Sequence, residues 1–241
     1  MTALILGAVM FAVLFAGFSA LGVWQVQRLA WKQELIQQVD ARIHAAPVGA
    51  PAPDQVVTRQ ADQYRRVVVS GRFEHQREAL VKAVTDLGPG YWVLTPLVTE
   101  QGFTVLINRG FVPSGRHKPA DRAAGQVEGQ AEGQAPVVGL LRLTEPDGGF
   151  LRANDPAGDR WFSRDVAGIA KAKGVSGPVA SYFIDADATP NPGGWPRGGL
   201  TVVRFNNSHL IYALTWFGLA LMSAAGFILF AREEKRRRAR R

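Results

Sequence analysis

The chain has 241 residues, is 47% hydrophobic, and carries a formal net charge of +8 at pH 7 without a single cysteine. The lack of cysteine excludes a disulfide framework, a CxxC redox centre, a copper- or zinc-thiolate site and a thiol nucleophile. Seven basic and two acidic residues occupy the last ten positions, so +5 of the net charge belongs to this tail. No nucleic-acid partner is predicted, because a basic tail beside an apolar segment is explained by membrane topology and anionic lipid headgroups.

The chain begins with an apolar segment, residues 1–24, in which residues 3–24 carry no formal charge. As a helix these residues would rise about 33 Å, which matches a hydrocarbon core of about 30 Å. A cleaved signal peptide typically has a basic n-region and a shorter apolar core. We therefore predict a retained transmembrane helix.

Helical spacing of apolar residues continues beyond this span and predicts a helical extension over residues 25–43. Prolines then interrupt the pattern, and residues 44–63 are predicted to be a linker. Within the span, an i+4 stripe of alanines is predicted to let a second helix approach closely. The stripe consists of Ala8, Ala12, Ala16 and Ala20.

Residues 64–205 have the pattern of a β-rich domain. Runs rich in Val, Thr and aromatic residues and bounded by Gly and Pro are typical of strands. Such runs cover residues 66–73, 78–84, 90–97, 103–108, 137–143, 181–185 and 201–205. The residues between the third and fourth runs suit a hairpin loop, and a helix is predicted from about Asp165 to Lys173, ended by Gly174. A Gly-Gln repeat predicts a flexible loop over residues 122–136.

A second span is predicted over residues 206–231, where residues 210–231 are uncharged. By the positive-inside rule the tail, residues 232–241, is cytoplasmic, which places the N-terminus on the same side and the central domain on the other. The basic residues Arg28 and Lys32 at the outer end of the first span are outweighed by the seven in the tail. The predicted fold is a membrane protein in which two transmembrane α-helices flank one β-rich α+β extramembrane domain, with enough strands for a barrel-like sheet.

No catalytic signature stands out in the sequence. There is no Gly-x-Ser-x-Gly elbow, Walker loop, Gly-x-Gly-x-x-Gly after a strand or His-Glu-x-x-His. His75 with Glu78, and Asp185 with Asp187, are close in sequence and are interpreted as solvated strand or loop features. An enzyme is not predicted, since a membrane-anchored hydrolase would need a nucleophile that the sequence does not reveal.

Two polar and aromatic clusters are expected to meet at one membrane face. Trp24 and Arg28 end the first span, while His209, Tyr212 and Trp216 share one face of the second helix at i, i+3, i+7. An imidazole can ligate haem iron, aromatic rings can pack on the macrocycle, and arginine can pair with propionates. The alternative is an ordinary interfacial belt of aromatic and basic side chains.

Over almost its whole length the chain resembles the surfeit locus protein one family of cytochrome c oxidase assembly factors. Four blocks carry the resemblance. They are Gly22, Trp24, Gln25, Arg28, Trp31 and Lys32; residues 95–97 with 107–113; residues 193–196; and His209, Tyr212, Thr215 and Trp216. One departure is Asn207-Ser208-His209, where the family usually has Asn-Asn-His. Serine keeps a short polar side chain that can cap the helix, whereas a role that needs an amide is lost.

The resemblance implies an assembly factor of haem-copper cytochrome c oxidase that binds haem a and assists its insertion into subunit I. It implies a bacterial inner membrane location with both termini cytoplasmic and the central domain periplasmic, and it implies subunit I, haem a synthase and the lipid bilayer as partners. His209 would be the axial ligand of the haem iron, with Trp24, Arg28, Tyr212 and Trp216 lining the pocket. The alternative is an adaptor that holds oxidase subunits or haem synthase without itself binding haem. Arg109 with Gly110 would either contact a partner or shape a turn.

Overall fold

The computed structural model describes residues 2–126, 136–149, 152–203 and 205–240. The chain forms two units, Met1–Gln38 with Arg204–Arg241 and Val39–Val203, and each is described by itself. Most of the predicted flexible loop, residues 127–135, lies outside the described residues.

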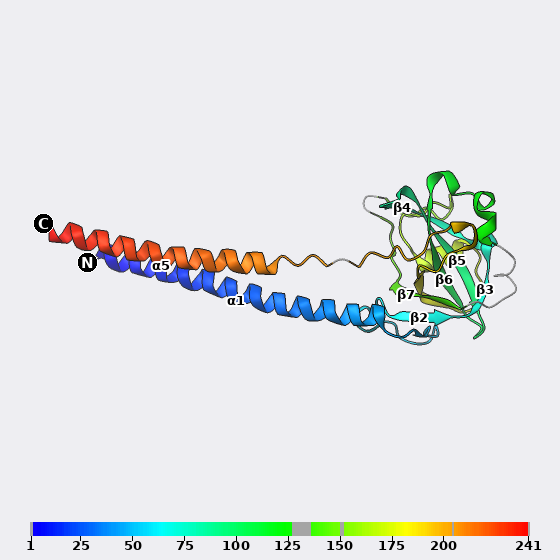
Figure 1. Ribbon diagram of the computed structural model, residues 1–241, viewed down its shortest axis with the longest axis horizontal. Helices are drawn as coiled ribbons and strands as arrows, with labels where there is room; N and C mark the ends of the chain where they lie inside the picture. Colours follow the sequence, from blue (N-terminus) through cyan, green and yellow to red (C-terminus); the bar gives the residue numbers. More distant parts are fainter. Residues whose placement is uncertain (1, 127–135, 150–151, 204, 241) are drawn as a thin grey trace. The chain divides into compact units, whose positions relative to one another are not determined.

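The first unit consists of two long apolar helices, α1 (Thr2–His44) and α5 (His209–Ala239). Each is long and apolar enough to cross a membrane (Figure 1), which confirms the prediction of two terminal spans. The helices pack side by side, since the ring of Phe11 lies 6.1 Å from that of Phe227 and the ring of Phe18 stacks on Trp216 at 5.8 Å. The helical extension is continuous with the first span, and α5 continues through the basic tail.

The face of α1 that meets α5 is not the alanine stripe. A Cβ added to Gly22 would lie 2.6 Å from the Phe217 ring, so the two helices approach closely at this glycine. In contrast, Ala12, Ala16 and Ala20 are exposed. The prediction was wrong because an i+4 stripe turns by about 40° around the helix at each step, whereas contact residues must keep to the helical period of about 3.6.

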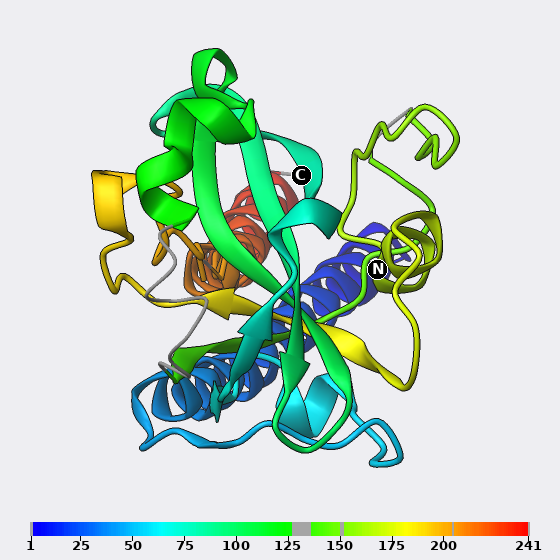
Figure 2. The ribbon, with the colours of Figure 1, turned by 90° about the vertical axis from the view of Figure 1, so that its right-hand side faces the viewer.

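The second unit is an eight-stranded mixed sheet of order β1-β2-β7-β8-β6-β5-β3, with β4 pairing with β5 outside this order. The strands are β1 (Val48–Gly49), β2 (Arg66–Val69), β3 (Gly71–Phe73), β4 (Ala79–Thr85), β5 (Gly88–Thr99), β6 (Thr104–Pro113), β7 (Val137–Leu143) and β8 (Val179–Ala186). The long antiparallel pair of β5 and β6, green in Figure 2, confirms the predicted hairpin. Among the described residues the sheet does not close into a barrel, because β1 and β3 remain as edges.

Apolar side chains of the sheet unit form two buried clusters. One contains Val67, Leu97 and Ile107, and the other contains Trp161 and Phe183. The second cluster also includes residues of α4 (Val166–Ala172), which confirms the predicted helix. The Asp165 carboxylate caps this helix by accepting from the backbone N–H of Gly168 at 3.1 Å, as an N-cap residue does. The position of β8 between β7 and β6 makes it a central strand of the core.

Three stretches differ from the prediction. The expected linker contributes β1 and a short helix, α2 (Arg59–Asp62), and the Tyr182 hydroxyl donates to the carbonyl of Pro51 at 2.6 Å. The expected strand over residues 201–205 has no ladder in its described part, so its β-forming composition does not lead to pairing. The first residues of the expected flexible loop belong to a 3₁₀ segment, η3 (Pro119–Gln126), in which Arg122 is buried.

Candidate functional site

The helix α5 begins at His209, directly after Ser208. The Ser208 side chain makes no capping hydrogen bond, so the capping expected of this serine is not observed; its carbonyl accepts from the N–H of Tyr212 at 3.2 Å. The half-buried His209 side chain faces α1, where Nδ1 lies 2.8 Å from Oε1 of Gln25. The Gln25 side chain is enclosed, with only 8% of the residue exposed.

The hydrogen bond to Gln25 selects one tautomer of His209. In the orientation that the structure gives the Gln25 amide, its oxygen faces Nδ1 and can only accept, so this hydrogen bond requires the proton of a neutral imidazole to lie on Nδ1. Nε2 then carries a lone pair, and it has no hydrogen-bond partner among the described residues. A metal-ligating histidine typically shows this arrangement, with one nitrogen free for the metal and the other held by a protein acceptor.

Two cations lie along α1 beyond Gln25. Arg28 stacks on the ring of Trp31 at 4.6 Å, and Lys32 lies 5.4 Å from the ring of Phe205, just before α5. Positions 25, 28 and 32 share one helix face by their spacing. The same end of the helix pair therefore offers an imidazole, aromatic rings and two cationic groups.

The predicted site residues are distributed unequally around His209. Trp24 and Tyr212 are half exposed, at 50% and 53%, while Trp216 packs inward on Phe18. The side chain that directly contacts His209 is Gln25, for which the sequence had suggested no role beyond its place in the first resemblance block. The i, i+3, i+7 spacing of Gly22, Gln25 and Leu29 is the signal that places Gln25 on the contact face.

These residues fit the haem group that the sequence resemblance implies. Nε2 of His209 is a suitable iron ligand, and arginine and lysine can pair with carboxylates. The half-exposed rings of Trp24 and Tyr212 are amphipathic surfaces typical of a membrane interface.

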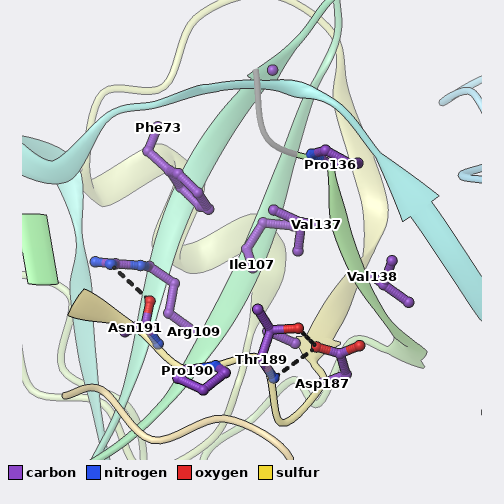
Figure 3. A pocket seen from close by; sticks show the side chains of 12 residues that line it. Phe73, Ile107, Arg109, Pro136, Val137, Val138, Asp187, Thr189, Pro190 and Asn191 are labelled. Atoms are coloured by element: carbon purple, nitrogen blue, oxygen red, sulfur yellow. Dashed lines mark hydrogen bonds between the residues drawn. The ribbon is translucent and has the colours of Figure 1, made fainter. Parts of the chain in front are cut away.

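A second polar cluster surrounds Arg109 in the sheet unit. Arg109 is 2% exposed, and its guanidinium contacts Nδ1 of His75 and Oδ1 of Asn191, each at 3.3 Å. Burial lowers the pKa of Arg109 to about 10, and burial together with the Arg109 charge lowers the pKa of His75 to about 4. Figure 3 shows Arg109 facing Asn191 beside a cavity of about 100 Å³ that Phe73 also lines.

The Arg109 cluster holds a loop in place. The Asn191 amide donates to the carbonyl of Pro196 at 2.6 Å, so Arg109 connects β6 to the loop that follows β8. The neighbouring Gly110 has φ of +128°, and a Cβ there would lie 2.1 Å from the carbonyl oxygen of Arg197. Of the two roles left open by the sequence, these contacts favour the structural one for Arg109 and Gly110.

Two carboxylates interpreted as solvated are buried. Asp185 accepts from Arg142 at 2.8 Å and from the Asn108 amide at 2.7 Å, and Glu78 pairs with Arg122. The interpretation of Asp185 and Glu78 as solvated was wrong, because each carboxylate pairs with an arginine that lies tens of residues away in the sequence. A cavity of about 620 Å³ borders the Asp185 network.

Known proteins match most of the chain. Residues 12–221 match the SURF1 family. Surfeit locus protein 1 of Rattus norvegicus is 35% identical over 232 residues, which cover 90% of this chain and 72% of that protein. The Homo sapiens protein of the same name is 36% identical over 227 residues, covering 87% and 72%, and that of Takifugu rubripes is 35% identical over 229 residues, covering 88% and 90%. These matches, which agree with a chain of two apolar terminal helices and one central sheet-forming segment, show that the chain belongs to the SURF1 family.

Proposed function

We propose that this protein binds haem a through His209 and assists its insertion into subunit I of cytochrome c oxidase. The broader role in oxidase assembly follows from membership of the SURF1 family, which is not a family of catalytic enzymes. The observation that carries the haem step is the hydrogen bond from His209 Nδ1 to Gln25, because it leaves Nε2 as a metal-binding lone pair.

Different residues at the outer end of the helix pair would contact different parts of the ligand. When bound, haem a would supply an iron that accepts an imidazole ligand, a flat apolar macrocycle and propionates. His209 would hold the iron through its Nε2 lone pair, and Trp24, Tyr212 and Trp216 would provide aromatic surface. Arg28 and Lys32 offer cations to the propionates, and Arg28 is held by its stacking on Trp31.

The proposed location is a bacterial inner membrane with both termini in the cytoplasm and the sheet unit in the periplasm. Two helices anchor the chain in a bilayer. The basic tail supports the orientation, and its i, i+4 pairs Glu233–Arg237 and Glu234–Arg238 keep it helical while leaving further basic groups for anionic lipids. Subunit I and haem a synthase are the proposed partners.

The test is the absorption spectrum of the full chain purified from cells that make haem a. The wild type is expected to carry haem with a histidine-ligated spectrum, and His209→Ala is expected to lose it. His44→Ala is the matched control, because His44 lies at the exposed end of α1. Bound haem with an unchanged spectrum in His209→Ala would refute the assignment of the ligand.

The alternative function is an adaptor that holds oxidase subunits or haem synthase without haem. The exposed rings of Trp24 and Trp31, at 50% and 51%, favour it as surfaces for another membrane protein. Wild-type protein that copurifies with oxidase subunits but carries no stoichiometric haem would establish this alternative.

A further inference from the structure

We infer that Gln25 is a positioning residue that presents His209 as a neutral, releasable ligand with Nε2 free. The inference rests on the proposed haem function and adds to it the residue that governs how firmly the ligand binds. Three observations carry it: the 2.8 Å contact between Gln25 Oε1 and His209 Nδ1, the burial of Gln25, and the absence of acidic residues nearby on either helix.

The helix packing holds Gln25 at this contact. Gly22 lies one turn earlier on the same face of α1, and the Phe217 ring occupies the space that a Cβ of residue 22 would need. Because the helices are this close, the enclosed Gln25 amide has little freedom to turn away from His209. The amide thus defines both the tautomer and the orientation of the imidazole.

A neutral acceptor has a specific consequence for the strength of the ligand. A carboxylate on Nδ1–H draws the proton away and makes Nε2 a more basic donor, whereas an amide oxygen polarises the ring less. The first acidic residue of α1 is Glu34, and that of α5 is Glu233, so no carboxylate of either helix lies within two turns of Gln25 or His209. A ligand of moderate strength suits a protein that must give its cargo to another protein.

The alternative explanation is that Gln25 has a structural role and only connects the two helices by a hydrogen bond, as buried polar residues in membrane helices often do. That role requires a hydrogen bond but makes no demand on the tautomer or on the iron. The two explanations therefore predict different results when the acceptor is changed from an amide to a carboxylate of the same shape.

The variants are Gln25→Glu, which retains the acceptor, and Gln25→Leu, which removes it. The matched control is Gln27→Glu, which adds the same charge two residues away on an exposed position. The first measurement needs no haem: ¹⁵N correlation spectra of the His209 imidazole in the full chain in detergent micelles. We expect the Nδ1–H tautomer in the wild type, in Gln27→Glu and in Gln25→Glu, and a mixture of tautomers in Gln25→Leu.

The second measurement follows haem a on the full chain, as its rate of transfer to an excess of a haem-accepting apoprotein and as the midpoint potential of the iron. Outer-shell partners typically change metal affinity by about 10- to 100-fold. We expect release about tenfold slower, with a lower midpoint potential, for Gln25→Glu, and about tenfold faster for Gln25→Leu. Gln27→Glu should behave as the wild type.

The outcomes distinguish the inference from the proposed function. Wild-type protein without haem would refute both. Haem that depends on His209 but is released at one rate from all Gln25 variants and from Gln27→Glu would refute the role of Gln25 alone. An Nε2–H tautomer in the wild-type spectrum would also overturn it, whatever the haem content.

Discussion

Arg122 and Glu78 form a bidentate ion pair in which the arginine side chain is 0% exposed and the carboxylate side chain 8%. The pair fastens η3 to the segment before β4 across 44 residues of sequence. Because both charged groups are removed from water, each needs the other to offset the free-energy cost of its desolvation.

Removing the Glu78 charge should therefore destabilise the sheet unit strongly. Glu78→Gln leaves the buried Arg122 guanidinium without its counter-ion, and we expect a loss of about 3–5 kcal/mol of unfolding free energy. Thermal and denaturant unfolding of the full chain in detergent measures it. The control is Arg160→Ala, which breaks the exposed pair with Asp155 and should change little; equal effects of the two variants would contradict the prediction.

Asp185→Asn should lower the unfolding free energy of the sheet unit nearly as much as Glu78→Gln. The carboxylate accepts from Arg142, from Arg164 at 3.4 Å, from the Asn108 amide at 2.7 Å and from the Thr201 hydroxyl at 2.9 Å, and an amide cannot satisfy all four donors. The expected loss is about 3 kcal/mol in the same unfolding measurement. Asp187→Asn is the matched control: among the described residues the Asp187 carboxylate accepts only from Thr189, in an exposed turn, so less than about 1 kcal/mol is expected there.

His75 should make the protein less stable in mild acid. Its Nδ1 faces the Arg109 guanidinium, and burial with this charge lowers its pKa from 6.5 to about 4. The unfolded chain binds a proton at His75 below about pH 6.5 while the folded chain does not, so stability falls as the pH drops from about 6.5 to about 4. The contribution is about 1–2 kcal/mol, reduced for solvent screening of a half-buried ring.

The pH effect is measured as the unfolding midpoint of the wild type and His75→Gln between pH 7.5 and 4.5. The difference between the two proteins should change across this range, with His75→Gln losing less stability on acidification. His117→Gln, at an exposed position, should follow the wild type. Parallel curves for the wild type and His75→Gln would contradict the prediction.

Gly22→Val should separate the helices where Gln25 meets His209. The added side chain would enter the space of the Phe217 ring, whereas nothing lies within 4 Å of a Cβ on Gly17. Because the chain has no cysteine, the pair Phe11→Cys and Phe227→Cys can report helix proximity through cross-linking by a short bifunctional maleimide. The yield should fall several-fold with Gly22→Val and stay unchanged with Gly17→Val, and equal yields would show that the contact at Gly22 does not hold the helices together.

The strands that sequence predicted correctly are those whose apolar pattern coincides with a buried ladder. The run over residues 103–108 lies in β6 from Thr104 on, and that over residues 137–143 is β7. The run over residues 201–205 has the same kind of composition, but its described part pairs with nothing, and Thr201 instead donates its hydroxyl to Asp185. The composition of a segment indicates its propensity to form a β-strand. The ladder itself forms only where a neighbouring strand supplies the backbone hydrogen bonds.

In the candidate site, too, the sequence predicted what depends on local spacing and missed what depends on tertiary contacts. Spacing alone placed His209, Tyr212 and Trp216 on one helix face, since helical periodicity is a local property. It did not identify Gln25 as the partner of His209, because that contact depends on which face of α1 meets α5. The alanine stripe suggested one face, and the close approach at Gly22 selected another.

By itself the sequence determined the two apolar helices, the basic tail, most of the strands and the absence of thiolate chemistry, because length, charge and residue type are readable position by position. Only the tertiary structure decided that the sheet stays open, that Glu78 and Asp185 are buried with arginines, and that Gln25 holds the His209 imidazole. Each of these depends on groups far apart in the chain, whose meeting is governed by packing and by the cost of leaving a buried polar atom without a partner.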